Sequence, residues 1–296
     1  MDTFPIRYIE PVFRPPSEAN SLILPVTNGC SWNNCRFCEM YTQPQKKFRA
    51  RDEAEVLDEI RRCGERLIVQ RVFLADGDAL VLPTHRLLTI LRHLREHMPE
   101  VERVASYCLP RNLRKKSVDE LKELADAGLK LVYVGAESGD DEVLARVNKG
   151  ETYESTRSAL VKLQQAGITR SVMILNGLGG EALSKQHAQN SARLMNQTQP
   201  EYLSTLVVSF PDGDGRFREG FTDFEPLDQQ SLLAELEMLL ESLELKSTVF
   251  RSDHASNYLA LKGVLGQDKA GLLAYIRRAI ENPQGSPLRQ EWQRGL

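Results

Sequence analysis

Six short apolar runs, each followed by an amphipathic segment, constrain the fold of this chain more than any other feature of its sequence. The runs are rich in β-branched residues and are predicted to be strands at 22–26, 71–74, 103–107, 129–134, 170–175 and 202–210. Strands separated by helices pair in parallel, because each right-handed crossover returns the chain to the same edge of the sheet. We therefore predict an α/β protein built as a partial (β/α)6 barrel of the TIM type.

Capping signals mark the ends of several predicted helices. Asp52 opens a helix with Val56 and Ile60 on its apolar face, and the Ser117 to Glu120 pattern is a capping box. Glycines are expected to end two of the helices. The predicted helices cover about 52–67, 117–127, 154–166, a stretch after 184, 232–243 and 268–280.

The domain organisation is predicted from the absence of a long linker, repeat or low-complexity segment. We expect a barrel core over 1–210, with a lead-in over 1–20, and a C-terminal extension over 211–296 that completes or covers the barrel. Within the extension, 245–250 is a candidate strand. The tail from 281 contains Asn-Pro, Gln-Gly and Ser-Pro turns and is expected to be irregular.

Composition limits the classes of partner. The chain has 41% hydrophobic and 27% charged residues, which is typical of a globular protein with a sizeable core. A net charge of −3 gives no global attraction to nucleic acid or anionic membrane. Basic runs at 46–51 and 111–116 could contact phosphate or RNA, but such runs are more typical of solvated faces. The sequence shows no export signal and no apolar run of ~20 residues, so we expect a cytoplasmic protein without membrane partners.

Three cysteines within nine residues, Cys30, Cys35 and Cys38, predict a metal site. Three thiolates can hold a [4Fe–4S] cluster and leave one iron open. A structural zinc site is an alternative, and it would take a fourth ligand from Cys63, Cys108 or a histidine. The C-x4-C-x2-C spacing also occurs in plant-type [2Fe–2S] ferredoxins, with Cys63 as a fourth ligand. However, Cys63 falls on the apolar face of a predicted helix, where cysteine usually acts as a small hydrophobe.

The cysteine loop follows the first predicted strand and ends in Phe37-Cys38, and in both respects it resembles the radical S-adenosylmethionine (SAM) superfamily. The usual family spacing is C-x3-C-x2-C, so this chain carries one additional residue. The resemblance implies a [4Fe–4S] cluster whose open iron binds the amino and carboxylate groups of SAM. It also implies reductive cleavage of SAM to methionine and a 5′-deoxyadenosyl radical that abstracts hydrogen from a substrate. Phe37 would lie near the adenine.

Two further motifs lie at predicted strand ends, where barrels of this kind carry their chemistry. Asp76-Gly77-Asp78 resembles the family turn that holds the methionine amino group. Glu137-Ser138, within a Gly-x-Glu-Ser-Gly pattern followed by Lys-Gly, resembles the Elp3/methylthiotransferase-like branch of the superfamily, in which Glu137 would bond ribose hydroxyls or a methionine group. The structural alternatives are an ordinary turn at the first motif and a helix cap at the second.

Weaker candidates complete the predicted site. Gly177 and Gly179 resemble the family turn that passes the adenine, and Ser106 ends the third strand as a possible SAM or substrate contact. Cys108 could be a substrate-side thiol, although a lone cysteine is more often part of the core.

A polar segment from Arg251 to Tyr258 includes His254, a candidate proton donor because histidine titrates near neutral pH. We expect this segment to cover the barrel mouth. A surface loop with one histidine is the alternative.

Three functional hypotheses remain open from the sequence. The first is a radical SAM enzyme that acts on a small molecule or nucleotide and takes electrons from a flavodoxin or ferredoxin. The second is an RNA- or peptide-modifying radical SAM enzyme. The third is a non-enzymatic iron–sulfur or zinc protein. The chain has no second cysteine cluster that would hold an auxiliary [4Fe–4S] centre.

Overall fold

The computed structural model describes residues 4–211 and 213–294, so the first three residues of the predicted lead-in and the last two of the tail lie outside it. The chain divides into two compact units, which we describe separately. The first unit contains the residues up to Asn33, Cys38–Val134 and Ala159–Arg170. The second contains Asn34–Phe37, Gly135–Ser158 and the residues from Ser171 onward.

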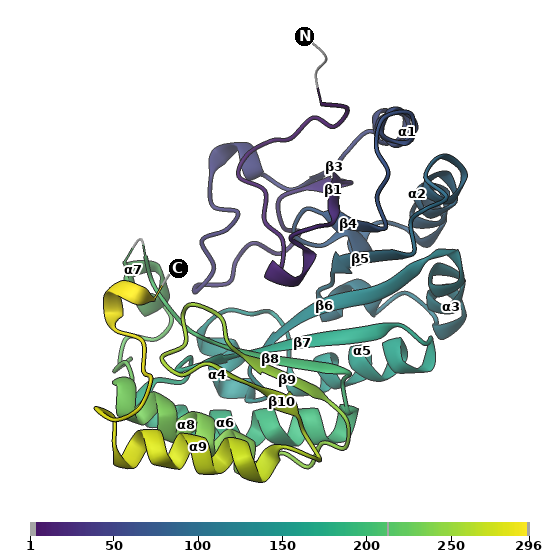
Figure 1. Cartoon of the computed structure of the whole chain (residues 1–296). Coiled ribbons are helices and arrows are strands. Elements are labelled where there is room, and N and C mark those ends of the chain that lie inside the picture. The colour runs from purple at the N-terminus through teal and green to yellow at the C-terminus, as the bar shows by residue number, and fades with distance from the viewer. Residues whose placement is uncertain (1–3, 212, 295–296) are drawn as a thin grey trace. The chain divides into compact units, whose positions relative to one another are not determined.

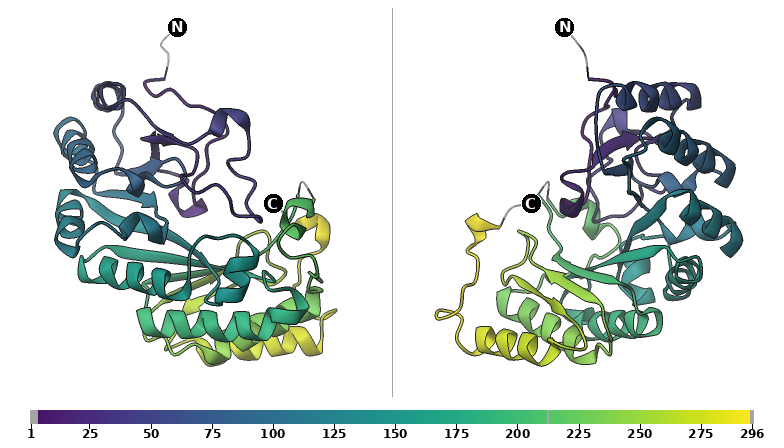
Figure 2. Two further views of the ribbon diagram at one scale, coloured as in Figure 1. Left: turned by 180° about the vertical axis from the view of Figure 1, so that it is seen from behind. Right: turned by 45° about the vertical axis from the view of Figure 1, so that its right-hand side comes forward.

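The first unit is built on parallel strands in the order β1-β4-β5-β6. Helices α1, α2 and α3 form a row along these strands (Figures 1 and 2). Alternate side chains, among them Phe73, Tyr107 and Tyr133, form one apolar cluster between the strands and the N-terminal segment. The element bounds are β1 Leu22–Pro25, β4 Arg71–Ala75, β5 Arg103–Tyr107, β6 Leu129–Glu137, α1 Glu53–Gly64, α2 Thr84–His97 and α3 Val118–Ala127.

A short antiparallel ribbon in the first unit was not predicted from the sequence. It pairs β2 (Thr27–Asn28) with β3 (Arg49–Ala50). Two-residue strands carry too little periodicity to be recognised from a sequence. The ribbon matters for function because the cysteine loop begins directly after β2.

The second unit contains strands in the order β7-β8-β9-β10, of which β7, β8 and β9 are parallel and β10 is antiparallel to β9. Helices α6, α8 and α9 lie side by side against these strands (Figure 1). Helix α5 (Tyr153–Gln165) runs from the second unit into the first. The other bounds are β7 Thr169–Asn176, β8 Tyr202–Val207, β9 Val249–Ser252, β10 Leu261–Val264, α4 Asp141–Arg146, α6 Gly180–Thr198, α7 Gly215–Arg218, α8 Gln229–Ser242 and α9 Lys269–Glu281.

The capping signals fold as predicted. The Asp52 side chain accepts a hydrogen bond from the Glu55 amide at the start of α1. Ser117 and Glu120 form a reciprocal capping box at α3, which ends at Gly128 with φ +125°. This left-handed conformation favours glycine.

Several boundaries differ from the prediction, and helix α2 and strand β10 were not predicted. The strand predicted over 202–210 ends at Val207, and the candidate strand at 245–250 is displaced to β9. Helix α6 begins at Gly180 without a side-chain cap, so no capping residue marked its start. Strand β10 was missed because it is short and contains a glycine, which weakens the strand pattern. Among the described residues, no helix is long and apolar enough to cross a bilayer.

Candidate functional site

Two aspartates at the end of β4 hold the backbone on both sides of Cys30. The Gly29 amide donates to Asp76 Oδ2 at 3.1 Å. The Ser31 amide donates to Asp78 Oδ1 at 3.0 Å, and the Ser31 hydroxyl donates to the other oxygen of the same carboxylate. Both carboxylates predicted to lie near SAM therefore also fix the start of the cysteine loop.

Gly77 allows this close approach of the two segments. A Cβ atom at Gly77 would come within 2.8 Å of the Cys30 Cβ and 2.9 Å of its Cα, which is shorter than real carbon contacts. The Gly77 amide also donates to the Gly29 carbonyl at 3.1 Å. The central glycine of the Asp-Gly-Asp turn is thus required by packing against the cysteine loop.

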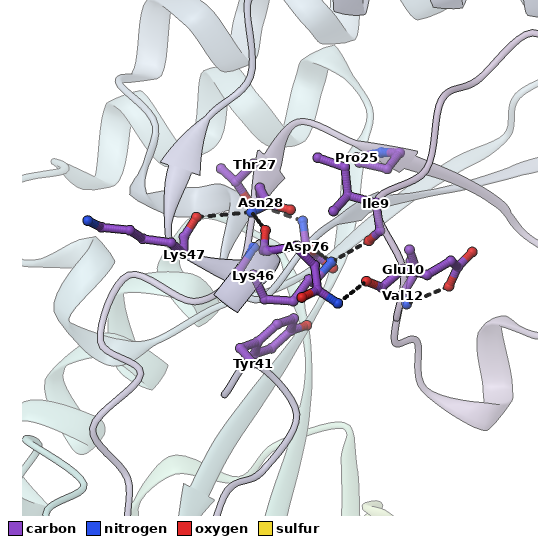
Figure 3. A network of polar contacts seen from close by, with 12 residues as sticks. Ile9, Glu10, Val12, Pro25, Thr27, Asn28, Tyr41, Lys46, Lys47 and Asp76 are labelled. Atoms are coloured by element: carbon purple, nitrogen blue, oxygen red, sulfur yellow. Dashed lines mark hydrogen bonds and ion pairs between the residues drawn. The ribbon is translucent and has the colours of Figure 1, made fainter. Parts of the chain in front are cut away.

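A buried lysine neutralises the first of these aspartates (Figure 3). Lys46 is fully buried, and its Nζ lies 2.5 Å from Asp76 Oδ2 and 2.8 Å from the Ile9 carbonyl oxygen. Burial raises the pKa of the Asp76 carboxyl, while the hydrogen bonds from Lys46 and the Gly29 amide oppose this rise. The interpretation of the basic run at 46–51 as a solvated face is therefore wrong for Lys46.

Two buried polar atoms beside this ion pair have no hydrogen-bond partner among the described residues. They are Asp76 Oδ1 and the hydroxyl of Tyr41, a residue that is 4% exposed. Burial and the nearby Asp76 carboxylate raise the pKa of Tyr41 well above its usual value, so its hydroxyl remains protonated. Because buried polar groups are normally hydrogen-bonded, an acceptor and a donor in this region are suited to a bound polar ligand.

The candidates at the end of β5 are buried. The Ser106 hydroxyl donates to the Leu74 carbonyl of the neighbouring strand at 3.0 Å. Cys108 is 1% exposed, and its amide donates to the Tyr133 carbonyl.

Cys63 is completely buried on α1, and burial and then Glu59 raise the pKa of its thiol to about 11. The protonated, buried thiol fits the expected role of Cys63 as a small hydrophobe.

Glu137, at the end of β6, forms a buried ion pair in the second unit. Its Oε1 lies 2.9 Å from Nζ of Lys149, and each side chain is 5% exposed. Its Oε2 is buried and has no hydrogen-bond partner among the described residues. The residue adopts φ +64°, a conformation that costs energy in a non-glycine residue and is often retained at functional sites.

Lys149 also connects Glu137 with the segment of the cysteine loop that belongs to this unit. The Arg36 amide donates to the Val147 carbonyl at 2.9 Å, which fixes this segment on the loop after α4. The Nζ of Lys149 lies 5.6 Å from the centroid of the Phe37 ring. Phe37 and Glu137, predicted to contact SAM, thus share a neighbour. Lys149 was part of a recognised motif but was not predicted as a site residue.

Ser138 stabilises the turn that leads into α4. Its hydroxyl accepts from the Asp140 amide at 3.0 Å and lies 2.8 Å from Nδ1 of His187. Asp140 in turn caps α4 by accepting from the amides of Glu142 and Val143. These contacts are those of the helix-capping alternative, and a ligand role for Ser138 remains a prediction.

The glycine turn after β7 is fixed by a buried carboxylate. The Gly177 amide donates to Glu235 Oε1 at 2.6 Å, and Glu235 is 2% exposed. Gly177 has φ +81°, and a Cβ there would come within 2.9 Å of the Leu232 side chain. Gly179 precedes α6 as its N-cap. Glu235 was not predicted as a site residue, because the sequence of its own helix gives no sign that its carboxylate binds the distant Gly177 turn.

The polar segment around His254 packs against the carboxyl end of β8. The Ser256 hydroxyl accepts from the Val207 amide, and the Asn257 side chain donates to the Thr205 carbonyl. The Ser256 amide donates to Nδ1 of His254, so the imidazole carries its proton on Nε2. Burial, and then the charge of Arg289, lower the pKa of His254. Its catalytic role and the covering of a barrel mouth remain predictions.

The fold and these turns define a class of protein: a mostly parallel α/β sheet protein with polar turns at the carboxyl ends of strands and a three-cysteine loop near the first strand. The model of the Radical SAM superfamily matches residues 24–190. The chain therefore belongs to the radical SAM superfamily, a superfamily of enzymes.

Individual relatives are distant. The chain is 26% identical over 164 residues to 4'-phospho-dehydrooxetanocin synthase of Priestia megaterium, which covers 50% of this chain and 22% of the relative. This chain spans less than two thirds of the length of the curated relatives that it matches.

Solved structures confirm the predicted fold class. Coproporphyrinogen III oxidase of Escherichia coli, a radical SAM enzyme, aligns with a TM-score of 0.57 at 16% identity, covering 90% of this chain and 70% of that one. The radical SAM methyltransferase TsrM of Kitasatospora setae, with cobalamin and a [4Fe-4S] cluster bound, aligns with a TM-score of 0.51 at 21% identity, covering 62% and 36%. The likeness shows the partial-barrel fold, with a sheet that is not closed.

Proposed function

We propose that this chain is a radical SAM enzyme in which Cys30, Cys35 and Cys38 ligate a [4Fe–4S] cluster and that it cleaves SAM reductively. The observation that carries the proposal is the three-cysteine loop, in a chain of this superfamily, held on both sides of Cys30 by the turn after β4. When bound, the cluster and SAM would supply a 5′-deoxyadenosyl radical for hydrogen abstraction from a substrate.

The donor set of this chain fits these groups. Thiolates are the usual ligands of iron–sulfur clusters, and three of them leave one iron for SAM. Within the first unit, the buried unpartnered Oδ1 of Asp76 is an acceptor suited to the amino group of SAM. Within the second unit, the buried unpartnered Oε2 of Glu137 is an acceptor suited to ribose hydroxyls. The aspartates at the end of β4 fix the loop backbone before ligands bind, which lowers the cost of ordering it.

The substrate we propose is a small molecule or nucleotide, with flavodoxin or ferredoxin as the electron donor, in the cytoplasm. One curated relative is a synthase named for a phosphorylated product, and this supports a small phosphorylated molecule as substrate. We propose that His254 donates or positions a proton from Nε2, and that Cys108 and Ser106 lie on the substrate or SAM side of the site.

Anaerobic reconstitution tests the proposal. The protein should bind about four irons, as a [4Fe–4S] cluster requires, and should form 5′-deoxyadenosine from SAM and dithionite. Each of Cys30→Ala, Cys35→Ala and Cys38→Ala should abolish both, whereas the matched control Cys63→Ala should retain both. Stoichiometric zinc, or a [2Fe–2S] spectrum that is lost in Cys63→Ala, would contradict the proposal.

A further inference from the structure

A hollow of about 770 Å³ lies in the first unit beside the cysteine loop, and we call it the basic pocket. Its volume is within the range of small-molecule sites in proteins. It is formed by the turns that follow β4 and β5 and by the first turns of α2 and α3. Its lining residues are Ser31, Val81, Pro83, Thr84, His85, Leu88, Arg111, Asn112, Arg114, Lys115, Lys116, Glu120 and Glu123.

The charge of this lining is predominantly positive. Arg111, Arg114, Lys115 and Lys116 contribute four cations, against the carboxylates of Glu120 and Glu123. Glu120 accepts from the Ser117 amide as part of the capping box of α3, and hydrogen bonds from Ser117 and Thr84 lower its pKa. Glu120 also interacts with the charge of Lys116, so it is the excess of four cations over two carboxylates in the lining that favours an anion in the pocket.

Lys116 places one of these cations inside the protein. The side chain is 7% exposed, and its Nζ donates to the Leu82 carbonyl at 2.7 Å. Burial lowers the pKa of Lys116. A buried ammonium group gains more from an anion than from a neutral carbonyl, because desolvation is then offset by charge pairing.

The first turn of α2 adds a second source of positive potential. The 14-residue helix begins after Pro83, with no side-chain cap and no acidic residue in its first turn. Thr84 and His85, its first two residues, line the pocket. A helix N-terminus carries exposed amide donors and a partial positive charge, and both suit a phosphate group.

We infer that the basic pocket binds a small molecule through a phosphate or diphosphate group. Lys116, Arg111 and the first turn of α2 would contact the anion, and the apolar Val81 and Leu88 would contact the rest of the ligand. The pocket also reaches the support of the cysteine loop, because Asn112 donates to Asp78, the residue that holds Ser31. This binding does not depend on the proposed SAM chemistry.

Isothermal titration of the anaerobic holoprotein tests the inference, with inorganic phosphate, pyrophosphate and ribose 5-phosphate as probes at constant ionic strength. At least one probe should bind saturably at one site. Lys116→Gln and Arg111→Gln should each weaken that binding about tenfold or more, as expected for loss of a charged hydrogen bond. The control Lys122→Gln removes an exposed charge of α3 outside the pocket and should change the dissociation constant less than about twofold.

Three results would overturn the inference. The first is no saturable binding of any probe at about 10 mM, which is a far weaker interaction than specific sites show. The second is binding by the folded Lys116→Gln and Arg111→Gln variants that equals binding by the wild type, and the third is displacement of the probes by a single-stranded RNA that binds more tightly. Arg111→Gln keeps the test decisive if the buried Lys116 variant fails to fold. Iron content and 5′-deoxyadenosine formation are measured on the same samples, so failure of the proposed function is distinguishable from failure of the pocket.

Discussion

Replacement of Lys46 by methionine measures how strongly the buried ion pair supports the cysteine loop. Methionine retains much of the side-chain volume and removes the charge. Asp76, 2% exposed, would then keep the Gly29 amide on Oδ2, while its Oδ1 has no partner among the described residues. Removal of one partner from a buried pair costs about 3–5 kcal/mol, because the other charge remains buried without compensation.

This loss predicts a lower melting temperature with a defined pH dependence. At about 2–3 °C per kcal/mol for a chain of this size, the decrease should be roughly 6–15 °C. Burial already raises the pKa of Asp76, and loss of Lys46 raises it further. The native state then binds a proton that the unfolded chain releases, so stability falls as pH rises from the unfolded pKa through the folded one. The deficit should therefore be larger at pH 7.5 than at pH 5.

Circular dichroism melting of the anaerobic holoprotein, with iron determined on the same samples, provides the assay. Lys47→Met is the matched control, because Lys47 is adjacent, exposed and of equal charge. The double variant Lys46→Met/Asp76→Asn should recover more than half of the loss, since no buried charge is left unpaired. The reasoning is refuted if Lys46→Met melts within about 2 °C of the wild type at pH 7.5, or if Lys47→Met is equally destabilised.

Two further predictions concern the second unit. Glu137→Gln should weaken SAM binding tenfold or more in equilibrium dialysis, as expected for the loss of a hydrogen bond to a charged group, and iron content should not change. The exposed control is Glu142→Gln. If both variants bind SAM equally well, Glu137 does not contact SAM. The lowered pKa of His254 means that the native state binds fewer protons than the unfolded chain, so its contribution to stability is present above pH 6.5 and is lost as pH falls below it. His254→Gln should therefore flatten the decrease in melting temperature between pH 7.5 and pH 5.5, and a profile as steep as that of the control His93→Gln would contradict this reading.

Features that depend on neighbours in the sequence could be predicted. The capping box at Ser117 and the stop at Gly128 are local hydrogen-bonding patterns, and the structure contains both. Strand β5 has the bounds predicted from its apolar run. The cysteine loop and the Asp-Gly-Asp turn were recognised by their resemblance to radical SAM motifs and by their positions after predicted strands, where barrels of this kind carry their chemistry.

Features that depend on residues distant in the sequence required the tertiary structure. Lys46 lies in a basic run typical of a solvated face, yet it is buried because it pairs with Asp76, which lies 30 positions away and directly follows β4. The same holds for Glu235, whose carboxylate binds the Gly177 amide across 58 positions. The basic pocket likewise forms only where the turns after β4 and β5 meet the ends of two helices. Sequence patterns report which groups are available, whereas burial and pairing are set by the elements that fold against them.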